Sequence, residues 1–199
     1  GCSSISTPRK DAVTNYLDHL HREIELVRDV LGEGRALGHV HWGGGTPNTL
    51  TDEQMVRLHT SISGAFSLLE GAEISMELDP RTATTDQLDL LSSLGFTRVS
   101  FGVQDFDPRV QEAVKRVQPF DMVARLHHHA RARGFRSVNF DLIYGLPYQT
   151  MQTWDETLAR VLDLRPDRLA VYAFAFVPWM KRHQKKLDQE ALPGAAERL

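Results

Sequence analysis

The order of segments along the chain limits its fold most strongly, because short apolar segments alternate throughout with segments of helical periodicity. Apolar residues recur at helical spacing from Tyr16 to Leu31, and Gly32 ends this first helix. The segments expected to form strands are residues 38–42, 74–79, 99–104, 138–144 and 169–176. The later helices are expected after Thr51 and Thr84, and over residues 120–133 and 151–164. This alternation predicts an α/β fold with about five parallel strands, right-handed crossovers and helices along one face.

Length and charge exclude several classes of function. The 199 residues suffice for one domain with a buried core, and no stretch resembles a linker between domains. A net charge of −3 without a dense basic run predicts no binding to nucleic acid. No apolar stretch is long enough to cross a bilayer, and the start of the chain, residues 1–4, lacks the regions of a signal peptide. These features predict a cytoplasmic protein without a membrane partner.

The metal-binding side chains of the sequence are few. Cys2 is the only cysteine, which excludes an internal disulfide and any all-cysteine metal site formed by this chain alone. His127, His128 and His129 are consecutive on a predicted helix, so their side chains point in different directions and cannot converge on one ion. We expect these histidines to be largely solvated, and we assign no metal ligand.

A glycine run closes the first predicted strand. Gly43, Gly44 and Gly45 follow His41-Trp42 and precede Thr46-Pro47, so three successive residues have no side chain. Such a run is typical of a tight turn between a strand and a helix, and equally of a loop whose bare N–H and C=O groups approach a ligand. The glycines alone leave both interpretations open.

Polar residues near the ends of the following strands favour the interpretation of the glycine run as a ligand-binding loop. Glu77, Gln104 and Asp141 interrupt strands that should be almost wholly apolar in a buried parallel sheet. Each of them alone is better explained as a capping or turn residue. Ligands of parallel α/β proteins, however, bind at the carboxyl ends of the strands. Polar groups at successive strand ends therefore predict one shared binding site there.

Four segments carry a resemblance to a known family: His41–Pro47, Met76–Pro80, Arg98–Phe106 and Asp141–Pro147. In order and nearly in spacing they resemble the motifs of oxygen-independent coproporphyrinogen III oxidase, a radical S-adenosylmethionine (SAM) enzyme. The resemblance implies a partial (β/α) barrel of the radical SAM type and a [4Fe–4S] cluster held by three cysteines. It also implies oxidative decarboxylation of coproporphyrinogen III to protoporphyrinogen IX in haem biosynthesis, with an unidentified electron donor and a monomeric full-length protein.

The chain departs from this family at both ends. Gly1-Cys2 resembles the tail of the family's cysteine loop, whose final cysteine does not bind the cluster, so the three ligands and the first strand are missing. Family members also continue into a helical C-terminal domain, whereas this chain stops at Leu199. We therefore expect residues 1–199 to form a single partial barrel domain that is inactive as it stands.

The resemblance also implies which residues bind SAM. Gly44, Gly45 and Thr46 would present backbone groups to one SAM molecule, and Glu77 would accept hydrogen bonds from its ribose hydroxyls. The family binds a second SAM molecule, and the matching positions are Gly45, Thr46, Gln104, Arg116, Asp141 and Ala175. Arg116 would suit a carboxylate through its planar guanidinium, although an arginine on a short polar helix is commonly a solvated surface residue. No catalytic residue is assigned.

Two alternative functions remain open from the sequence. The haem chaperone related to this family binds haem without oxidising porphyrinogen, but Gly1-Cys2 and His41-Trp42 resemble the oxidase instead. An unrelated barrel could use the glycine run to bind phosphate, but the carboxylate of Glu77 beside that loop would repel it. The oxidase is therefore the preferred interpretation.

Overall fold

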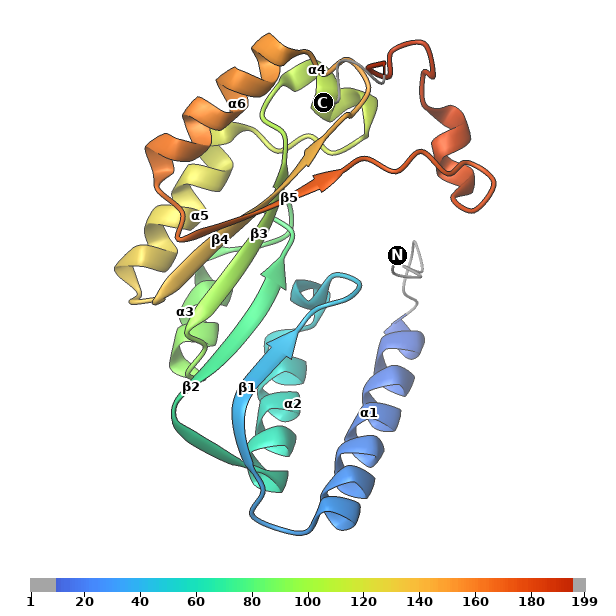
Figure 1. Cartoon of the computed structure of the whole chain (residues 1–199). Helices are drawn as coiled ribbons and strands as arrows, with labels where there is room; N and C mark the ends of the chain where they lie inside the picture. The colour runs from blue at the N-terminus through green and yellow to red at the C-terminus, as the bar shows by residue number, and fades with distance from the viewer. Residues whose placement is uncertain (1–9, 195–199) are drawn as a thin grey trace.

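A parallel sheet forms the centre of the computed structural model, which describes residues 10–194. Its strands are β1 (Ala36–Trp42), β2 (Ser67–Leu78), β3 (Arg98–Gln104), β4 (Ser137–Tyr144) and β5 (Arg168–Ala173). They pair in the order β1-β2-β3-β4-β5, every pair is parallel, and together they curve into an open arc (Figure 1). The prediction of five parallel strands in chain order is confirmed. Within the described residues, one side of β1 and one side of β5 have no neighbouring strand.

Helices connect the strands and cover one face of the arc. They are α1 (Lys10–Leu31), α2 (Asp52–Ala65), α3 (Thr85–Ser93), α4 (Pro108–Ala113), α5 (Phe120–Ala132) and α6 (Met151–Leu164). Figure 1 shows α2, α3, α5 and α6 along the same face, with α1 beside α2. Two short 3₁₀ helices, η1 (Pro47–Thr49) and η2 (Arg182–Lys186), complete the structure; these and α4 were not predicted. None of the helices in the described part of the chain is long and apolar enough to cross a membrane.

Polar side chains cap the starts of α2 and α3, the two helices expected after Thr51 and Thr84. The Thr51 hydroxyl accepts from the Gln54 N–H while the Gln54 side chain accepts from the Thr51 N–H, which is a complete capping box. Thr84 likewise accepts from the Gln87 N–H at the start of α3. The Gln87 amide, however, donates to the backbone oxygen of Asn48, and thereby links α3 to η1.

Alternation along the strands separates the core from the opposite, concave face of the sheet. Val99, Phe101 and Val103 of β3 are fully buried in the core, together with apolar residues of the helices. Because successive side chains of a strand point to opposite faces, Ser100 and Gly102 lie on the concave face. The same alternation in the other strands brings their polar residues to this face, which the helices leave open.

Two strands differ from their predicted bounds by more than two residues at one end. β2 begins at Ser67, earlier than expected, because its first residues pair with Ala36 and Leu37 of β1 across a register shift. β5 ends at Ala173, and its predicted last residues, 174–176, continue outside the sheet.

His127 corrects the prediction that the three histidines are largely solvated. Its side chain is only 3% exposed, its ring meets Phe140 at 5.6 Å between centroids, and neither ring nitrogen has a hydrogen-bond partner. The buried residues of α5 are Val123, Leu126, His127 and Ala130, so helical periodicity places His127 on the core side. His128 is exposed as expected, and half-buried His129 bonds to Asp89 of α3.

We expect His127 to make the fold sensitive to acid. Burial, and then the charge of Arg131, lower the pKa of His127 from 6.5 to about 4, so the unfolded chain binds the proton more tightly. Stability is therefore lost as the pH falls below about 6.5, by about 2 kcal/mol at pH 5 from this residue. His127→Phe should remove this part of the loss in urea unfolding at pH 7 and pH 5, whereas His128→Gln should not. An equal loss in wild type and His127→Phe would contradict the assignment.

Candidate functional site

The glycine run forms a loop between β1 and η1, next to the end of β2. Gly44 has a φ of +106°, a left-handed conformation that residues with a side chain rarely adopt. Its N–H points to β2 and donates to Glu77 Oε2 at 3.2 Å. Thr46 precedes η1, and its carbonyl accepts from the Thr49 hydroxyl at 2.7 Å. A Cβ placed on Gly44 or Gly45 would meet nothing within 4 Å, so space remains open beside the loop.

His41 contacts both Glu77 and Ser75, which the sequence did not predict. Ser75 lies opposite His41 in the β1–β2 register, and Glu77 follows two residues later on the same face of β2. The His41 ring bonds to Ser75 Oγ through Nδ1 at 2.9 Å and to Glu77 Oε1 through Nε2 at 3.3 Å. The only signal in the sequence is the two-residue spacing between Ser75 and Glu77, which becomes informative once the β1–β2 register is known.

Asp141 lies on the same concave face, close to Glu77. It lies inside β4, as its place in the expected strand 138–144 implies, and it accepts a hydrogen bond from the Ser100 hydroxyl at 3.2 Å. Burial raises the pKa of Asp141, the Ser100 hydrogen bond lowers it in part, and the negative charge of Glu77 raises it again. Glu77 pairs with Ser100 in the β2–β3 register, and Ser100 bonds to Asp141, so the two predicted carboxyl groups share one region of the sheet.

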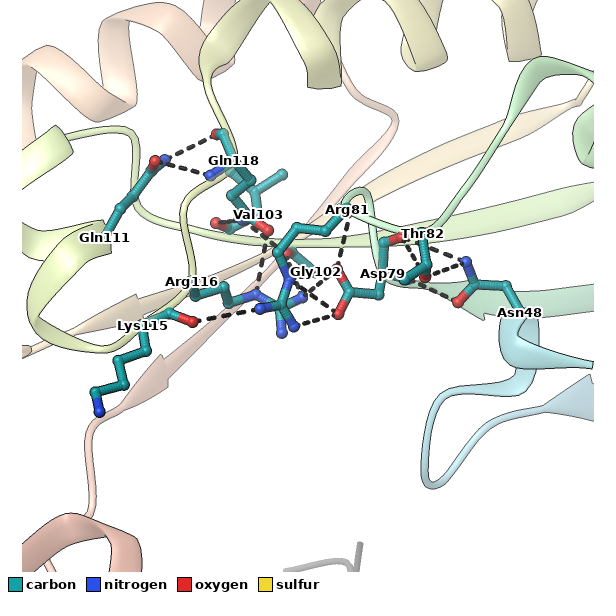
Figure 2. Close-up of polar contacts among 10 residues, drawn as sticks. All are labelled: Asn48, Asp79, Arg81, Thr82, Gly102, Val103, Gln111, Lys115, Arg116 and Gln118. Atoms are coloured by element: carbon teal, nitrogen blue, oxygen red, sulfur yellow. Dashed lines mark hydrogen bonds and ion pairs between the residues drawn. The ribbon is translucent and has the colours of Figure 1, made fainter. Parts of the chain in front are cut away.

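Arg116 points inward rather than into solvent. Lys115, just beyond α4, has a left-handed φ of 55°, and the chain turns there toward the sheet. The Arg116 guanidinium donates to the Gly102 carbonyl at 3.0 Å and to Gln118 Oε1 at 3.2 Å, and Nη2 lies 3.4 Å from Asp79 Oδ1 (Figure 2). Burial lowers the pKa of Arg116, and the charge of Asp79 opposes this effect.

Gln104 and Arg116 meet over Gly102. A Cβ at Gly102 would lie 2.8 Å from Gln104 Nε2 and 2.9 Å from Arg116 Nη2, so both side chains use the space that glycine leaves. Gln104 has a positive φ of 67°, at a shift in the β3–β4 register that ends the regular pairing of β3. Backbone strain of this kind is often found at binding sites.

Ala175 lies beyond β5, at the same carboxyl end of the sheet. Its carbonyl accepts from Gln184 Nε2 at 3.0 Å, and the other end of the Gln184 amide accepts from the Val177 N–H at 2.6 Å. In residues 10–194, no hydrogen bond joins Ala175 to the other predicted site residues. The structure thus brings Gly44, Glu77, Asp141, Gln104 and Arg116 together, with Gly45 and Thr46 in the adjoining loop.

Asp79, at the end of β2, connects the glycine loop to Arg116. Its carboxylate binds the Arg81 guanidinium at 2.6 Å and faces Arg116, while its N–H donates to the side-chain oxygen of buried Asn48 at 3.0 Å (Figure 2). Burial alone would raise the pKa of Asp79, but the hydrogen bonds from Arg81 and the charge of Arg116 lower it below its usual range. Asn48 belongs to η1, so this contact anchors the far end of the glycine loop.

A groove of about 690 Å³ lies on the other side of the glycine loop. Its walls are apolar residues of three elements, among them Val13, Leu17 and Leu20 of α1, Val40 and Trp42 of β1, and Leu58 and Ile62 of α2. Residues 43–47 close one end of the groove. The glycine loop therefore lies between an apolar groove and the polar concave face.

The described residues contain no group that could bind a metal ion through three ligands. Within residues 10–194, no three His, Cys, Asp or Glu side chains converge in this way. Cys2 lies outside the described residues.

Comparison with known proteins establishes the family. The sequence profile of the Radical SAM superfamily matches residues 5–161, well over half of the chain. The chain belongs to the radical SAM superfamily. The matched residues include the glycine loop and the strands β1 to β4 of the sheet described above.

Individual relatives within the superfamily are highly similar. The chain is 48% identical to the oxygen-independent coproporphyrinogen III oxidase of Synechocystis and 43% identical to that of Escherichia coli K12, over 199 residues each. All of this chain is covered in both cases, but only 43% of each relative. The chain therefore spans less than half the length of these curated relatives.

Solved structures confirm the fold. The E. coli coproporphyrinogen III oxidase, described as a radical SAM enzyme, matches with a TM-score of 0.95 and 42% identity over 100% of this chain and 45% of its own. An archaeal Elp3 from Methanocaldococcus infernus matches with a TM-score of 0.62 at 15% identity, over 84% of this chain and 45% of its own, which shows a shared fold alone. The prediction of a partial radical SAM barrel is confirmed.

We expect Asp79→Asn to destabilise the fold by about 1–3 kcal/mol, because it leaves partly buried guanidinium groups without their countercharge. Urea unfolding at pH 7 measures the change. Asp29→Asn is the matched control, because Asp29 pairs with Arg28 on the exposed surface of α1 and should leave stability unchanged. Equal stabilities of Asp79→Asn and wild type would show that this ion pair does not hold the site together.

Proposed function

We propose that this chain forms the SAM-binding part of an oxygen-independent coproporphyrinogen III oxidase. The observation that carries the proposal is the convergence of Gly44, Glu77, Asp141 and Arg116 on the concave face of one parallel sheet, toward the carboxyl ends of its strands. Relatives of that name match the whole chain at 48% and 43% identity, and this similarity supports the oxidase over the haem chaperone and the phosphate-binding barrel.

The residues of the glycine loop fit one SAM molecule. SAM has a zwitterionic amino-acid end and a ribose diol, so it requires backbone donors and acceptors and a strong hydrogen-bond acceptor. Gly44 and Gly45 offer main-chain groups beside open space, and Thr46 follows them. The Glu77 side chain is 43% exposed, and its carboxylate retains lone pairs for the ribose hydroxyls.

A second SAM molecule would occupy the region around Gln104, Arg116 and Asp141, next to Gly45 and Thr46. Arg116 is held in place by the Gly102 carbonyl and Gln118, which pre-organises its cation for a carboxylate. Asp141 would accept hydrogen bonds from polar groups of the ligand. Ala175 would contribute to the same site from the loop after β5, which Gln184 fixes.

This chain lacks the side chains that would hold the [4Fe–4S] cluster. A [4Fe–4S] cluster in this superfamily needs three cysteine thiolates, and the sequence has one cysteine. We propose that the ligands belong to a segment that precedes residue 1 in a longer protein. That segment would include a strand on the open side of β1, because a right-handed crossover through α1 places the preceding strand there. The bound cluster supplies the electron for reductive cleavage of SAM.

The reaction proposed for the longer protein converts two propionate side chains of coproporphyrinogen III to vinyl groups. Each propionate would give one hydrogen atom to the 5′-deoxyadenosyl group supplied by SAM and one electron to an unidentified acceptor, and would release carbon dioxide, which yields protoporphyrinogen IX. We propose that a helical C-terminal domain completes the substrate site, that an unidentified protein donates electrons, and that the enzyme is a cytoplasmic monomer that binds no nucleic acid. In this reaction the residues of the present chain bind and orient SAM.

The first test concerns the cluster. Anaerobic reconstitution should load a [4Fe–4S] cluster onto the longer protein, but not onto the chain of residues 1–199, because that chain lacks the ligands. Iron analysis and visible absorption measure loading. A stoichiometric cluster on the shorter chain would overturn the ligand assignment.

The second test concerns the SAM site in the longer protein. Glu77→Ala should weaken SAM binding by about 1–3 kcal/mol, because the ribose hydroxyls lose their acceptor. Gly44→Val should weaken it further, because valine strains a backbone with φ +106° and fills the adjacent space. Calorimetry with SAM measures both effects.

Two control variants separate binding from folding. Glu70→Ala removes an exposed carboxylate from the same strand, and Gly34→Val introduces valine at another positive φ, +75°, in the turn before β1. Neither should change SAM affinity. Thermal unfolding without SAM should be unchanged by Glu77→Ala, and unchanged SAM affinity of both site variants would refute the site assignment.

A further inference from the structure

We propose that His41 is a positioning residue that holds the Glu77 carboxylate in the orientation in which it binds SAM. The inference rests on the proposed function, because it takes SAM as the ligand of Glu77. It adds a residue to the site that acts through Glu77.

The contacts form a series from one strand to the next. Ser75 Oγ holds one ring nitrogen of His41 at 2.9 Å, and the opposite ring nitrogen reaches Glu77 Oε1 at 3.3 Å. The Gly44 N–H holds the other carboxylate oxygen, Oε2, at 3.2 Å. Each oxygen of Glu77 therefore has its own donor, which fixes both the position and the plane of the carboxylate.

The hydrogen-bond chemistry determines the direction of the contact. A carboxylate only accepts, so His41 must carry a proton on Nε2. The Ser75 hydroxyl can then donate to Nδ1 of a neutral ring, or it can accept from a doubly protonated ring and donate to the Val40 carbonyl, 3.4 Å away. In both arrangements His41 donates to Glu77, so the contact persists in either charge state of the imidazole.

The absence of a side chain at Gly43 makes room for His41 and Glu77. A Cβ at Gly43 would lie 2.6 Å from His41 Nε2 and 3.0 Å from the Glu77 carboxyl carbon. Unlike Gly44, Gly43 is not in the left-handed region, so its backbone does not itself require glycine. Glycine is needed at position 43 because the ends of the His41 and Glu77 side chains occupy the space that a Cβ would take. An alanine would displace the flexible ends of these two side chains and leave the backbone in place.

Exposure indicates that the pair contributes to binding more than to folding. The side chains of His41 and Glu77 are 52% and 43% exposed, and pairs so open to water add little to stability. A fixed carboxylate, in contrast, loses less conformational freedom when a ligand binds. Loss of His41 should therefore lower SAM affinity while the fold remains stable.

The first experiment needs no cofactor. In the longer protein labelled with ¹⁵N-histidine, long-range ¹H–¹⁵N spectra at fixed pH should show a proton on Nε2 of His41. Glu77→Gln and Gly43→Ala should both shift this signal, whereas Gly38→Ala, whose methyl would meet only Leu69 at 3.9 Å, should not. An unchanged His41 signal in both Glu77→Gln and Gly43→Ala would overturn the proposal.

The second experiment measures SAM affinity by calorimetry in the reconstituted longer protein. His41→Leu should weaken binding about fivefold to tenfold, the effect of one lost hydrogen bond. His41→Gln, whose amide nitrogen can donate from a similar place, should restore affinity to within about twofold. His39→Leu, two residues earlier on the same face, is the matched control and should have no effect.

A double-mutant cycle separates the two proposals. If His41 acts through Glu77, His41→Leu should cause no further loss in the Glu77→Ala background. If His41→Leu weakened SAM binding equally in the wild-type and Glu77→Ala backgrounds, the role of His41 would be overturned. The same holds if His41→Leu left SAM binding of the wild type unchanged while Glu77→Ala weakened it. Both results would leave the SAM site itself standing. Unchanged affinity in Glu77→Ala itself would instead overturn the SAM site, and the inference with it.

Discussion

The structure depends on the alternation of side chains along strands that all run in the same direction. In β3 and β4, Phe101 and Phe140 enter the core, while Ser100 and Asp141 lie on the opposite face and bond to each other. Parallel pairing in chain order repeats this division across the arc and brings every carboxyl end to the same edge. A polar site can therefore form on the same strands that bury the core.

A flexible loop must be anchored if it is to present its backbone to a ligand. The glycine loop is anchored at one end by the strand pairing of Trp42 with Met76, both buried. At the other end, buried Asn48 bonds to the backbone of Asp79 and receives the Gln87 amide from α3. The stretch without bulky side chains therefore lies between two firmly packed ends. These anchored ends limit the conformational entropy that the loop loses when a ligand binds.

Local pattern was sufficient for the fold, because helix periodicity, caps and strand segments are encoded by neighbouring residues. It was insufficient where the outcome depends on geometry between elements. The inward direction of Arg116 follows from the left-handed turn at Lys115. The burial of His127, in contrast, follows the helical spacing of the apolar residues of α5, a local pattern that the prediction overlooked. The His41–Glu77 contact depends on the β1–β2 register, which a single sequence does not reveal. The motif resemblance proposed the site residues, but only coordinates show which of them touch.

The two open sides of the sheet have a consequence for the behaviour of the isolated chain. β1 and β5 differ in sequence and lie at opposite ends of the arc, and Leu169, Val171 and Tyr172 of β5 are each at least 40% exposed. If β5 of one copy paired with β1 of the next, the contact would be head-to-tail and would leave the same two edges free again. Such a contact repeats from copy to copy, so the curvature of the arc (Figure 1) decides the outcome: a rotation that closes gives a ring of copies, and one that does not gives an open filament.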